Sequence, residues 1–565
     1  MPLNLFRIVS DAPAAKTKKI ALLLSSITGA LLEIAGLAVI VPLLLLVLNE
    51  QGSMENKYFR YAYEATGAES YGTFLLIIMA AVLLFVISKN IILHVLNDYR
   101  TKRLLEIYAS CSERLFLSYY SRGLLFIKNS SPLALSHHVN SACYQYVFGL
   151  ILPALTMLSD LLLIALILIA LAWVNLWVAA LELFLFAPVV LFFHLRVAGL
   201  LRKAGEADHQ AKKQQWRIAA EAFRGYPDID VNSYFPGMEK TFREGIQKIC
   251  TNKRQIEHLK SLSSRSVEIS LILMVAILVA GYYFFSGRDA GFLTVTGIFA
   301  AASLRLLPAV RSVIAQYGTL SNSSHTAAII DDFGADAGTG QEKAAPLAFG
   351  HSIEFRNVSF GFAPGRPVLK NVCLSVKKGE RIGIKGVSGV GKSTFLYLLM
   401  GHYEPDEGSI CIDGVRLSSE NKKAWHRHIG YVAQEVFIMN GSLEQNIVPS
   451  GAADHARMTA AIEQSALAGL AGKLNERLSS ETGENGSRLS GGEKQRVGIA
   501  RAHYRGADVL IMDEPTSALD PDTEKEITAN IEHQFLKKNL TIIIVSHRET
   551  ILSKCDRIIN LDTLV

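Results

Sequence analysis

Long apolar runs separated by polar stretches fill the chain before Tyr317, and shorter runs of strand length follow Gly350. The run over 20–48 contains a single charged residue, Glu33, and is longer than the roughly 20 residues that a helix needs to cross a membrane. Five further runs are apolar over a comparable length, the last two being polar at one end: 73–96, 146–173, 176–195, 267–285 and 292–315. The pattern predicts six membrane-spanning helices.

Lysine and arginine gather on one set of loops. They precede the first run and fill the polar stretches 100–128 and 196–265, while the intervening loops carry few. Because positive loops stay in the cytoplasm, this distribution predicts a multi-pass protein of the cytoplasmic membrane with both chain ends inside. A cleaved signal peptide is the alternative for the first run, but its length and the lack of a small-residue cleavage site favour a retained helix.

The two long polar connections are too long for simple turns and read as helices that continue into the cytoplasm. Polar breaks near 129–132 and 226–229 interrupt these helices. The breaks are either short docking elements or ordinary surface loops. We therefore expect a transmembrane domain over 1–332, an Ala- and Gly-rich linker over 333–350, and a soluble α/β domain over 351–565.

Composition supports a membrane protein and argues against one other class. Half of the 565 residues are hydrophobic and only 19% are charged, which is too apolar an average for a soluble enzyme. The net charge of +6 lies mostly beside apolar runs, where membrane topology explains it. We expect no nucleic-acid partner.

A glycine-rich segment, Gly386-Val-Ser-Gly-Val-Gly-Lys-Ser393, follows the apolar strand 381–385 and precedes a helix-like run. This is the context of a phosphate-binding loop, in which backbone N–H groups surround phosphate, Lys392 reaches the outer phosphates and Ser393 offers a hydroxyl to Mg²⁺. The expected nucleotide-binding residues of this segment are Gly386, Ser388, Gly389, Gly391, Lys392, Ser393 and Thr394.

Two carboxylates end a second buried-strand pattern, Val509-Leu-Ile-Met-Asp513-Glu514. Asp513 is suited to hold Mg²⁺, and Glu514 is suited to act as general base toward an attacking water. Acidic residues at strand ends are common, but Leu489-Ser-Gly-Gly-Glu493 lies just upstream. At this point the sequence resembles the ABC ATPase family, which carries this serine-glycine segment.

That resemblance implies ATP and Mg²⁺ as ligands and assigns roles to four further residues. Phe362 is expected to stack on adenine, Gln434 to sense metal and γ-phosphate while contacting the membrane domain, and His547 to contact γ-phosphate. Asp520, in the segment after the carboxylates, joins the nucleotide-binding set. Taken singly, a lone Gln or His is more often a surface residue; the order of the motifs carries the assignment.

In the family, the signature serine reaches the nucleotide bound by the facing subunit. Ser490, Gly491 and Gly492 are therefore expected to complete a partner's site, with a homodimer as the simplest assembly and a heterodimer as the alternative. The segment 481–486 and the fused membrane domain resemble half-size ABC exporters. The implied fold is a multidomain membrane protein, with an all-α six-helix transmembrane domain followed by an α/β P-loop ATPase domain.

Ionisable residues within or near the spans bear on the substrate. Lys89, Arg265 and Arg305 resemble the cationic cavity of bacterial lipid-linked oligosaccharide flippases, although Lys89 stands where arginine is expected and lacks its bidentate fork. This implies an amphiphilic cargo and membrane lipid as partner. Alternatively these cations and Arg311 are paired structurally; the candidate counter-charges are Glu33, Asp160, Glu182 and Glu268. A peptide or multidrug exporter is the alternative function, followed by an ATP-gated channel or sensor.

Overall fold

The computed structural model describes residues 16–48, 57–174, 196–285, 290–334, 346–363, 365–448, 453–467, 481–516 and 519–563, with seven single positions between 176 and 191. The chain divides into two compact units. The first comprises Met1–Ser121 and Ser130–Ala337, and the second comprises Arg122–Asn129 and Gly338–Val565. Each unit is described by itself.

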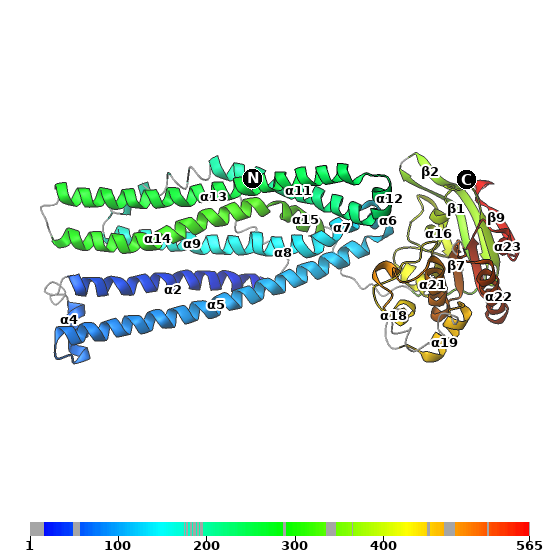
Figure 1. Cartoon of the computed structure of the whole chain (residues 1–565). Coiled ribbons are helices and arrows are strands. Elements are labelled where there is room, and N and C mark those ends of the chain that lie inside the picture. Colours follow the sequence, from blue (N-terminus) through cyan, green and yellow to red (C-terminus); the bar gives the residue numbers. More distant parts are fainter. Residues whose placement is uncertain are drawn as a thin grey trace. The chain divides into compact units, whose positions relative to one another are not determined.

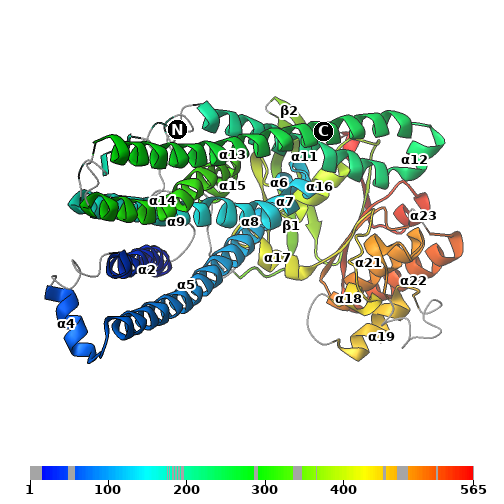
Figure 2. The same ribbon diagram turned by 60° about the vertical axis from the view of Figure 1, so that its left-hand side comes forward.

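The first unit is helical, and its long helices run beside one another along most of their length (Figures 1 and 2). The long helices are α2 (Lys16–Leu48), α5 (Tyr71–Ser121), α9 (Leu152–Val174), α11 (Ala198–Arg224), α13 (Phe235–Phe285) and α14 (Ala290–Ser323). The short helices are α4 (Lys57–Thr66), α7 (Pro132–His137), η1 (His138–Ala142), α8 (Cys143–Tyr146), η2 (Val147–Ile151), α12 (Tyr226–Val231) and α15 (His325–Gly334).

Five of the six predicted spans coincide with helices. Within the described part of the chain, three helical stretches are long and apolar enough to cross a membrane: Thr17–Gly36, Tyr71–Ser121 and Pro132–Trp173. The fifth and sixth predicted spans form the C-terminal part of α13 and most of α14. The fourth, 176–195, lies mostly outside the described residues.

One apolar cluster of the first unit joins α9 to α14. Leu163 and Ile167 on one helix and Leu306 and Val310 on the other are buried in a single apolar cluster. Both pairs are spaced four residues apart, which places their side chains on one face of each helix. Short helices flank or cover the polar breaks predicted near 129–132 and 226–229: α6 (Gly123–Asn129) ends at the first break, α7 begins there, and α12 covers the second.

The second unit is an α/β domain with two sheets. Its strands are β1 (Ser352–Ala363), β2 (Arg366–Lys377), β3 (Arg381–Lys385), β4 (Glu407–Ile412), β5 (Val415–Arg416), β6 (Ile429–Val432), β7 (Val509–Asp513), β8 (Thr541–Val545) and β9 (Arg557–Asn560). Its helices after α6 are α16 (Lys392–Leu399), α17 (Lys422–His428), α18 (Leu443–Ile447), α19 (His455–Gln464), η4 (Glu484–Gly486), α21 (Gly491–Arg505), α22 (Pro521–Lys538), α23 (Glu549–Leu552) and η5 (Leu561–Thr563).

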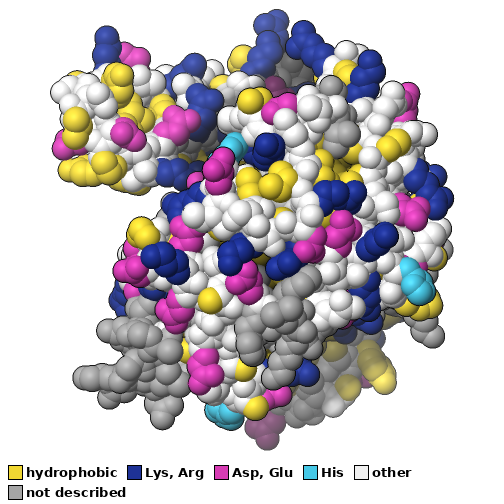
Figure 3. All heavy atoms as spheres, turned by 90° about the vertical axis from the view of Figure 1, so that its right-hand side faces the viewer, with side chains coloured by type: hydrophobic (Ala, Val, Ile, Leu, Met, Phe, Trp, Pro, Cys, Tyr) yellow, Lys and Arg dark blue, Asp and Glu magenta, His cyan; other side chains and the backbone are white. Residues whose placement is uncertain are grey.

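A parallel five-stranded sheet, ordered β6-β7-β8-β3-β9, forms the centre of this unit, beside an antiparallel sheet ordered β2-β1-β4-β5. Strands β7 and β8 are buried at every position. The predicted strand 381–385 coincides with β3, and β7 covers all but the last residue of the predicted strand pattern 509–514, so both predictions are confirmed. On the face seen in Figure 3, positive and negative side chains are interspersed, as is typical of a water-exposed surface.

Helix α6 belongs to the second unit although it lies within the helical half of the sequence. Its Leu124 packs against the apolar core of that unit. The Lys128 ammonium lies 4.2 Å from the centroid of the Tyr397 ring, a cation–π distance. One of the predicted cytoplasmic breaks therefore carries a short element that is docked on the α/β unit.

Candidate nucleotide site and the membrane cations

The phosphate-binding loop lies between β3 and α16. Gly389 and Gly391 adopt φ values of +88° and +105°, which favour glycine because a side chain would strain the backbone. A Cβ atom on Gly391 would also approach Val368 to 2.9 Å. The Lys392 ammonium folds over the loop and donates to the carbonyls of Gly386 at 2.8 Å and Val387 at 3.1 Å. The loop therefore has the backbone conformation, and the ammonium close by, that a phosphate-binding loop requires.

An aspartate far along the chain anchors the start of this loop. The backbone N–H of Val387 donates to both carboxylate oxygens of Asp562, at 3.1 and 3.3 Å. Asp562 lies 175 positions later and follows strand β9, which pairs with β3. Sequence reasoning missed this residue, because nothing in its local sequence distinguishes it from other surface aspartates.

A hydroxyl and a carboxylate lie together beside the loop. The Ser393 hydroxyl, at the start of α16, donates to Asp513 Oδ2 at 3.2 Å. Burial raises the pKa of Asp513 above its ordinary value, and the charge of Glu514 adds to that rise, while Ser393 and Lys392 oppose it. A buried carboxylate of this kind gains most from a nearby cation. These two oxygen donors therefore fit a hard divalent ion such as Mg²⁺.

Glu514 follows Asp513 in a turn with φ of +47°. The Gln434 side-chain amide donates to Glu514 Oε2 at 3.1 Å, and His547 Nε2 lies 3.5 Å from Glu514 Oε1. His547 Nε2 also lies 3.0 Å from the Lys392 ammonium. The structure thus brings together four residues that the sequence places in four separate segments.

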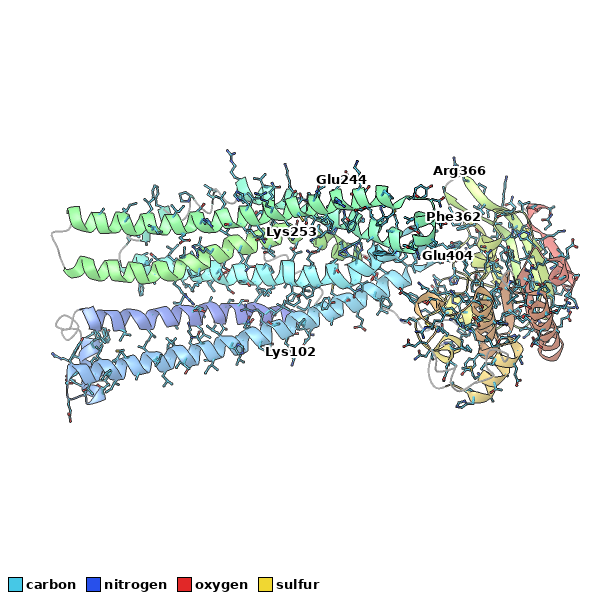
Figure 4. The ribbon with its side chains drawn as sticks, in the orientation of Figure 1. Lys102, Glu244, Lys253, Phe362, Arg366 and Glu404 are labelled. Atoms are coloured by element: carbon cyan, nitrogen blue, oxygen red, sulfur yellow. The ribbon has the colours of Figure 1, made fainter. Side chains whose placement is uncertain are left out.

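Phe362 lies near the end of β1, in a hairpin with β2 (Figure 4). Its ring meets Phe360 and Tyr403 edge-on, with interplanar angles of 86° and 90°. The side chain is nonetheless exposed, at 57% of its free surface. Aromatic neighbours therefore orient the ring while leaving it available for stacking on a flat ligand.

The serine-glycine segment forms the start of α21. Ser490 caps this helix, since its hydroxyl accepts from the Glu493 N–H and Glu493 accepts from the Ser490 N–H in return. Gly491 and Gly492 form the first turn, where free N–H groups favour an anion. Asp520 caps α22 by accepting from the Thr523 N–H at 3.0 Å, and this bond lowers the pKa of Asp520.

In the first unit, the structure pairs the cations that were candidates for a cavity. The Lys89 ammonium lies 3.1 Å from Glu33 Oε2, and Arg305 pairs with the same carboxylate oxygen. Arg311 pairs with Glu268 at 2.8 Å. The Arg265 side chain is exposed, and Glu182 lies outside the described residues. The structural pairing anticipated as an alternative is therefore present for three of these four cations.

Comparison with known proteins identifies the family. The family model described as "ABC transporter" matches residues 369–517. A curated relative, the ATP-dependent lipid A-core flippase of Vibrio cholerae, is 30% identical over 408 residues, which cover 70% of this chain and 68% of the relative. The chain belongs to the ABC transporter family.

Two further likenesses place the chain within that family. The β-(1→2)glucan export ATP-binding/permease protein NdvA of Rhizobium etli is 37% identical over 253 residues, 45% of this chain, and the match spans only 41% of that relative. A solved bacterial Atm1-family ABC exporter with ATP bound superposes with a TM-score of 0.77, covering 96% of this chain and 93% of the other at 21% identity. The ABC transporter described here therefore shares the fold of a bacterial Atm1-family ABC exporter.

Proposed function

We propose that this ABC transporter is an ATP-driven exporter or flippase of the cytoplasmic membrane that moves an amphiphilic substrate with an anionic head group. The observation that carries the proposal is the convergence of Lys392, Asp513, Glu514 and His547 in a chain that also contains long apolar helices. Domain boundaries at 1–332, 333–350 and 351–565 belong to the proposal, as do a homodimer and membrane lipid as partners. Relatives named for lipid A-core and glucan export favour a glycolipid or glycan class of cargo.

Hydrolysis is assigned to the residues gathered around Glu514. Its carboxylate accepts a proton from the attacking water, and the amide of Gln434, 3.1 Å away, holds it in orientation. Ser393 and Asp513 would hold Mg²⁺, which when bound neutralises phosphate charge. Lys392 and His547 supply donors toward the outer phosphate.

The remaining nucleotide contacts are divided between two chains. Phe362 stacks on the base, and the loop N–H groups surround the phosphates. Ser490 and the first turn of α21 approach the nucleotide of the partner, with Asp520 beside the shared site. A dimer of identical chains then contains two complete sites, because each chain carries both halves.

The proposal that the cargo has an anionic head group is tested by removing two cations of the first unit, Lys89 and Arg305. Replacing Lys89 and Arg305 with Gln should abolish ATP-dependent movement of a fluorescent polyprenyl diphosphate lipid across proteoliposomes, since each charge-assisted contact contributes roughly 1.5–3 kcal/mol. ATP hydrolysis without cargo should survive, because the second unit retains its site. The matched control, Lys102→Gln with Arg254→Gln, removes two exposed charges from α5 and α13.

Three outcomes separate the candidate functions. If the variant with Lys89 and Arg305 replaced loses flipping but keeps ATP hydrolysis, and the control variant keeps both, the result supports an anionic cargo. Unchanged flipping contradicts it, and loss of both flipping and hydrolysis indicates a structural role for the two cations. ATP-dependent uptake of an uncharged drug or a peptide, with no movement of the diphosphate lipid, would favour the peptide or multidrug exporter.

A further inference from the structure

One carboxylate in the first unit pairs with two cations from two other helices. Glu33 lies on α2, Lys89 on α5 and Arg305 on α14. Glu33 Oε2 is 3.1 Å from the Lys89 ammonium and also pairs with Arg305. We refer to these three residues as the Glu33 triad. Its formal charge is +1, whereas the two cations alone would carry +2.

The packing around the triad accommodates this pairing. A Cβ atom on Gly36, one turn after Glu33 on α2, would lie 2.9 Å from the Lys89 nitrogen. The absence of a side chain there lets the ammonium lie against α2, where the carboxylate meets it. The Lys89 side chain is only 10% exposed, so its charge is compensated chiefly by Glu33.

The triad is nevertheless reachable. The Glu33 side chain is 28% exposed and Arg305 is 36% exposed. An incoming anion can therefore approach the arginine and the carboxylate while Lys89 remains covered. To engage both cations it must take the place of Glu33, since the same carboxylate oxygen contacts both of them.

We propose that Glu33 is a specificity-determining residue. Its carboxylate pairs with the two cations that would bind the cargo, and only a cargo with an anionic head group displaces it. The inference rests on the proposed function and names the feature that selects its substrate. A neutral cargo cannot replace the carboxylate, because displacing it would leave the buried Lys89 ammonium, with Arg305 beside it, without a counter-charge. A phosphate or diphosphate has enough oxygens to satisfy both cations.

The test is Glu33→Gln, which keeps the shape and removes the competing charge. Binding of fluorescent polyprenyl diphosphate to the purified full-length protein, measured by anisotropy without nucleotide, should tighten about tenfold, the equivalent of 1.4 kcal/mol. Binding of the corresponding uncharged polyprenol should not change. ATP-driven flipping of the diphosphate lipid should slow at saturation, because nothing displaces the bound anion for release.

Two further variants keep the test decisive. Glu33→Asp retains the charge and should bind both lipids as the parent does, which separates charge from loss of folding. Glu268→Gln removes the carboxylate that pairs with Arg311 at 2.8 Å, outside the triad, and should leave the preference unchanged. Retention of the oligomer on gel filtration checks the fold of each variant.

The failure of the inference differs from the failure of the proposed function. If the parent flips the diphosphate lipid but Glu33→Gln binds it no more tightly, or tightens equally on the uncharged lipid, the role of Glu33 is overturned. If the parent does not flip the lipid but Glu33→Gln still gains affinity for it selectively, the inference stands and the proposed transport falls. Absence of binding to either protein overturns both.

Discussion

The second unit, which carries the candidate ATPase site and is called the ATPase unit below, differs from the first, the membrane unit, in how its charged side chains are compensated. In the ATPase unit, Asp513 is buried with its pKa raised, and Lys392 and His547 lie close by, an arrangement that favours an added cation and phosphate. In the membrane unit, Glu33 is already paired with both Lys89 and Arg305. A motif whose polar groups bind a ligand can be recognised from sequence. The role of an isolated cation, by contrast, can be inferred only once the residue that pairs with it is known.

The largest effect should come from removing the proposed general base. Glu514→Gln keeps the side-chain shape but cannot accept a proton, so ATP hydrolysis should fall by roughly 10²–10⁴-fold while ATP binding persists. Phosphate release and retention of labelled ATP by the purified protein measure the two quantities. Glu420→Gln, at an exposed position of the same unit, should hydrolyse ATP as the parent does. Hydrolysis at the parental rate in Glu514→Gln would refute the assignment.

A second experiment asks whether the ATPase site is completed by another chain. Lys392→Ala and Ser490→Arg each inactivate a pure dimer, but a mixed dimer concentrates both lesions in one site and leaves the other intact. Mixing the two proteins should therefore restore part of the hydrolysis, measured after subunit exchange has been demonstrated with tagged chains. No gain over either pure variant would contradict a site shared across the signature segment.

The smallest expected effect is a loss of stability at acid pH, to which a buried histidine of each unit should contribute. Burial lowers the pKa of His426 in the ATPase unit, whose Nε2 lies 2.7 Å from the Met400 carbonyl. Burial, followed by the charge of His325, lowers the pKa of His209 in the membrane unit, where the two rings lie 4.2 Å apart. The unfolded chain takes up these protons near pH 6.5 and the folded chain only at lower pH, so the free energy of unfolding falls as pH decreases from about 6.5.

Thermal unfolding of the detergent-solubilised protein at about pH 7.5 and about pH 5.5 measures this fall. His426→Gln and His209→Gln should each reduce the acid-induced decrease in Tm. His258→Gln, at an exposed position on α13, should leave it unchanged. An identical decrease in all four proteins would show that neither buried imidazole resists protonation.

The sequence by itself determined the elements whose causes are local. Strands β3 and β7 lie where predicted, to within one residue, because buried parallel strands are short apolar runs bounded by polar residues. The phosphate-binding loop follows from its glycines, since Gly389 and Gly391 need positive φ values wherever the loop is placed. The long apolar helices were likewise set by run length.

Only the tertiary structure decided which distant groups meet. Gln434 and Glu514 are 80 positions apart, Lys392 and His547 are 155 apart, and Val387 relies on Asp562 at a separation of 175. Sheet order brings the first two pairs together, and the ABC resemblance anticipated their proximity but not their bonds. For the Glu33 triad the sequence left several ion pairs open. The strength of an ion pair depends on the distance between its charges, and for residues on different helices the packing of the helices, not the local sequence, sets that distance.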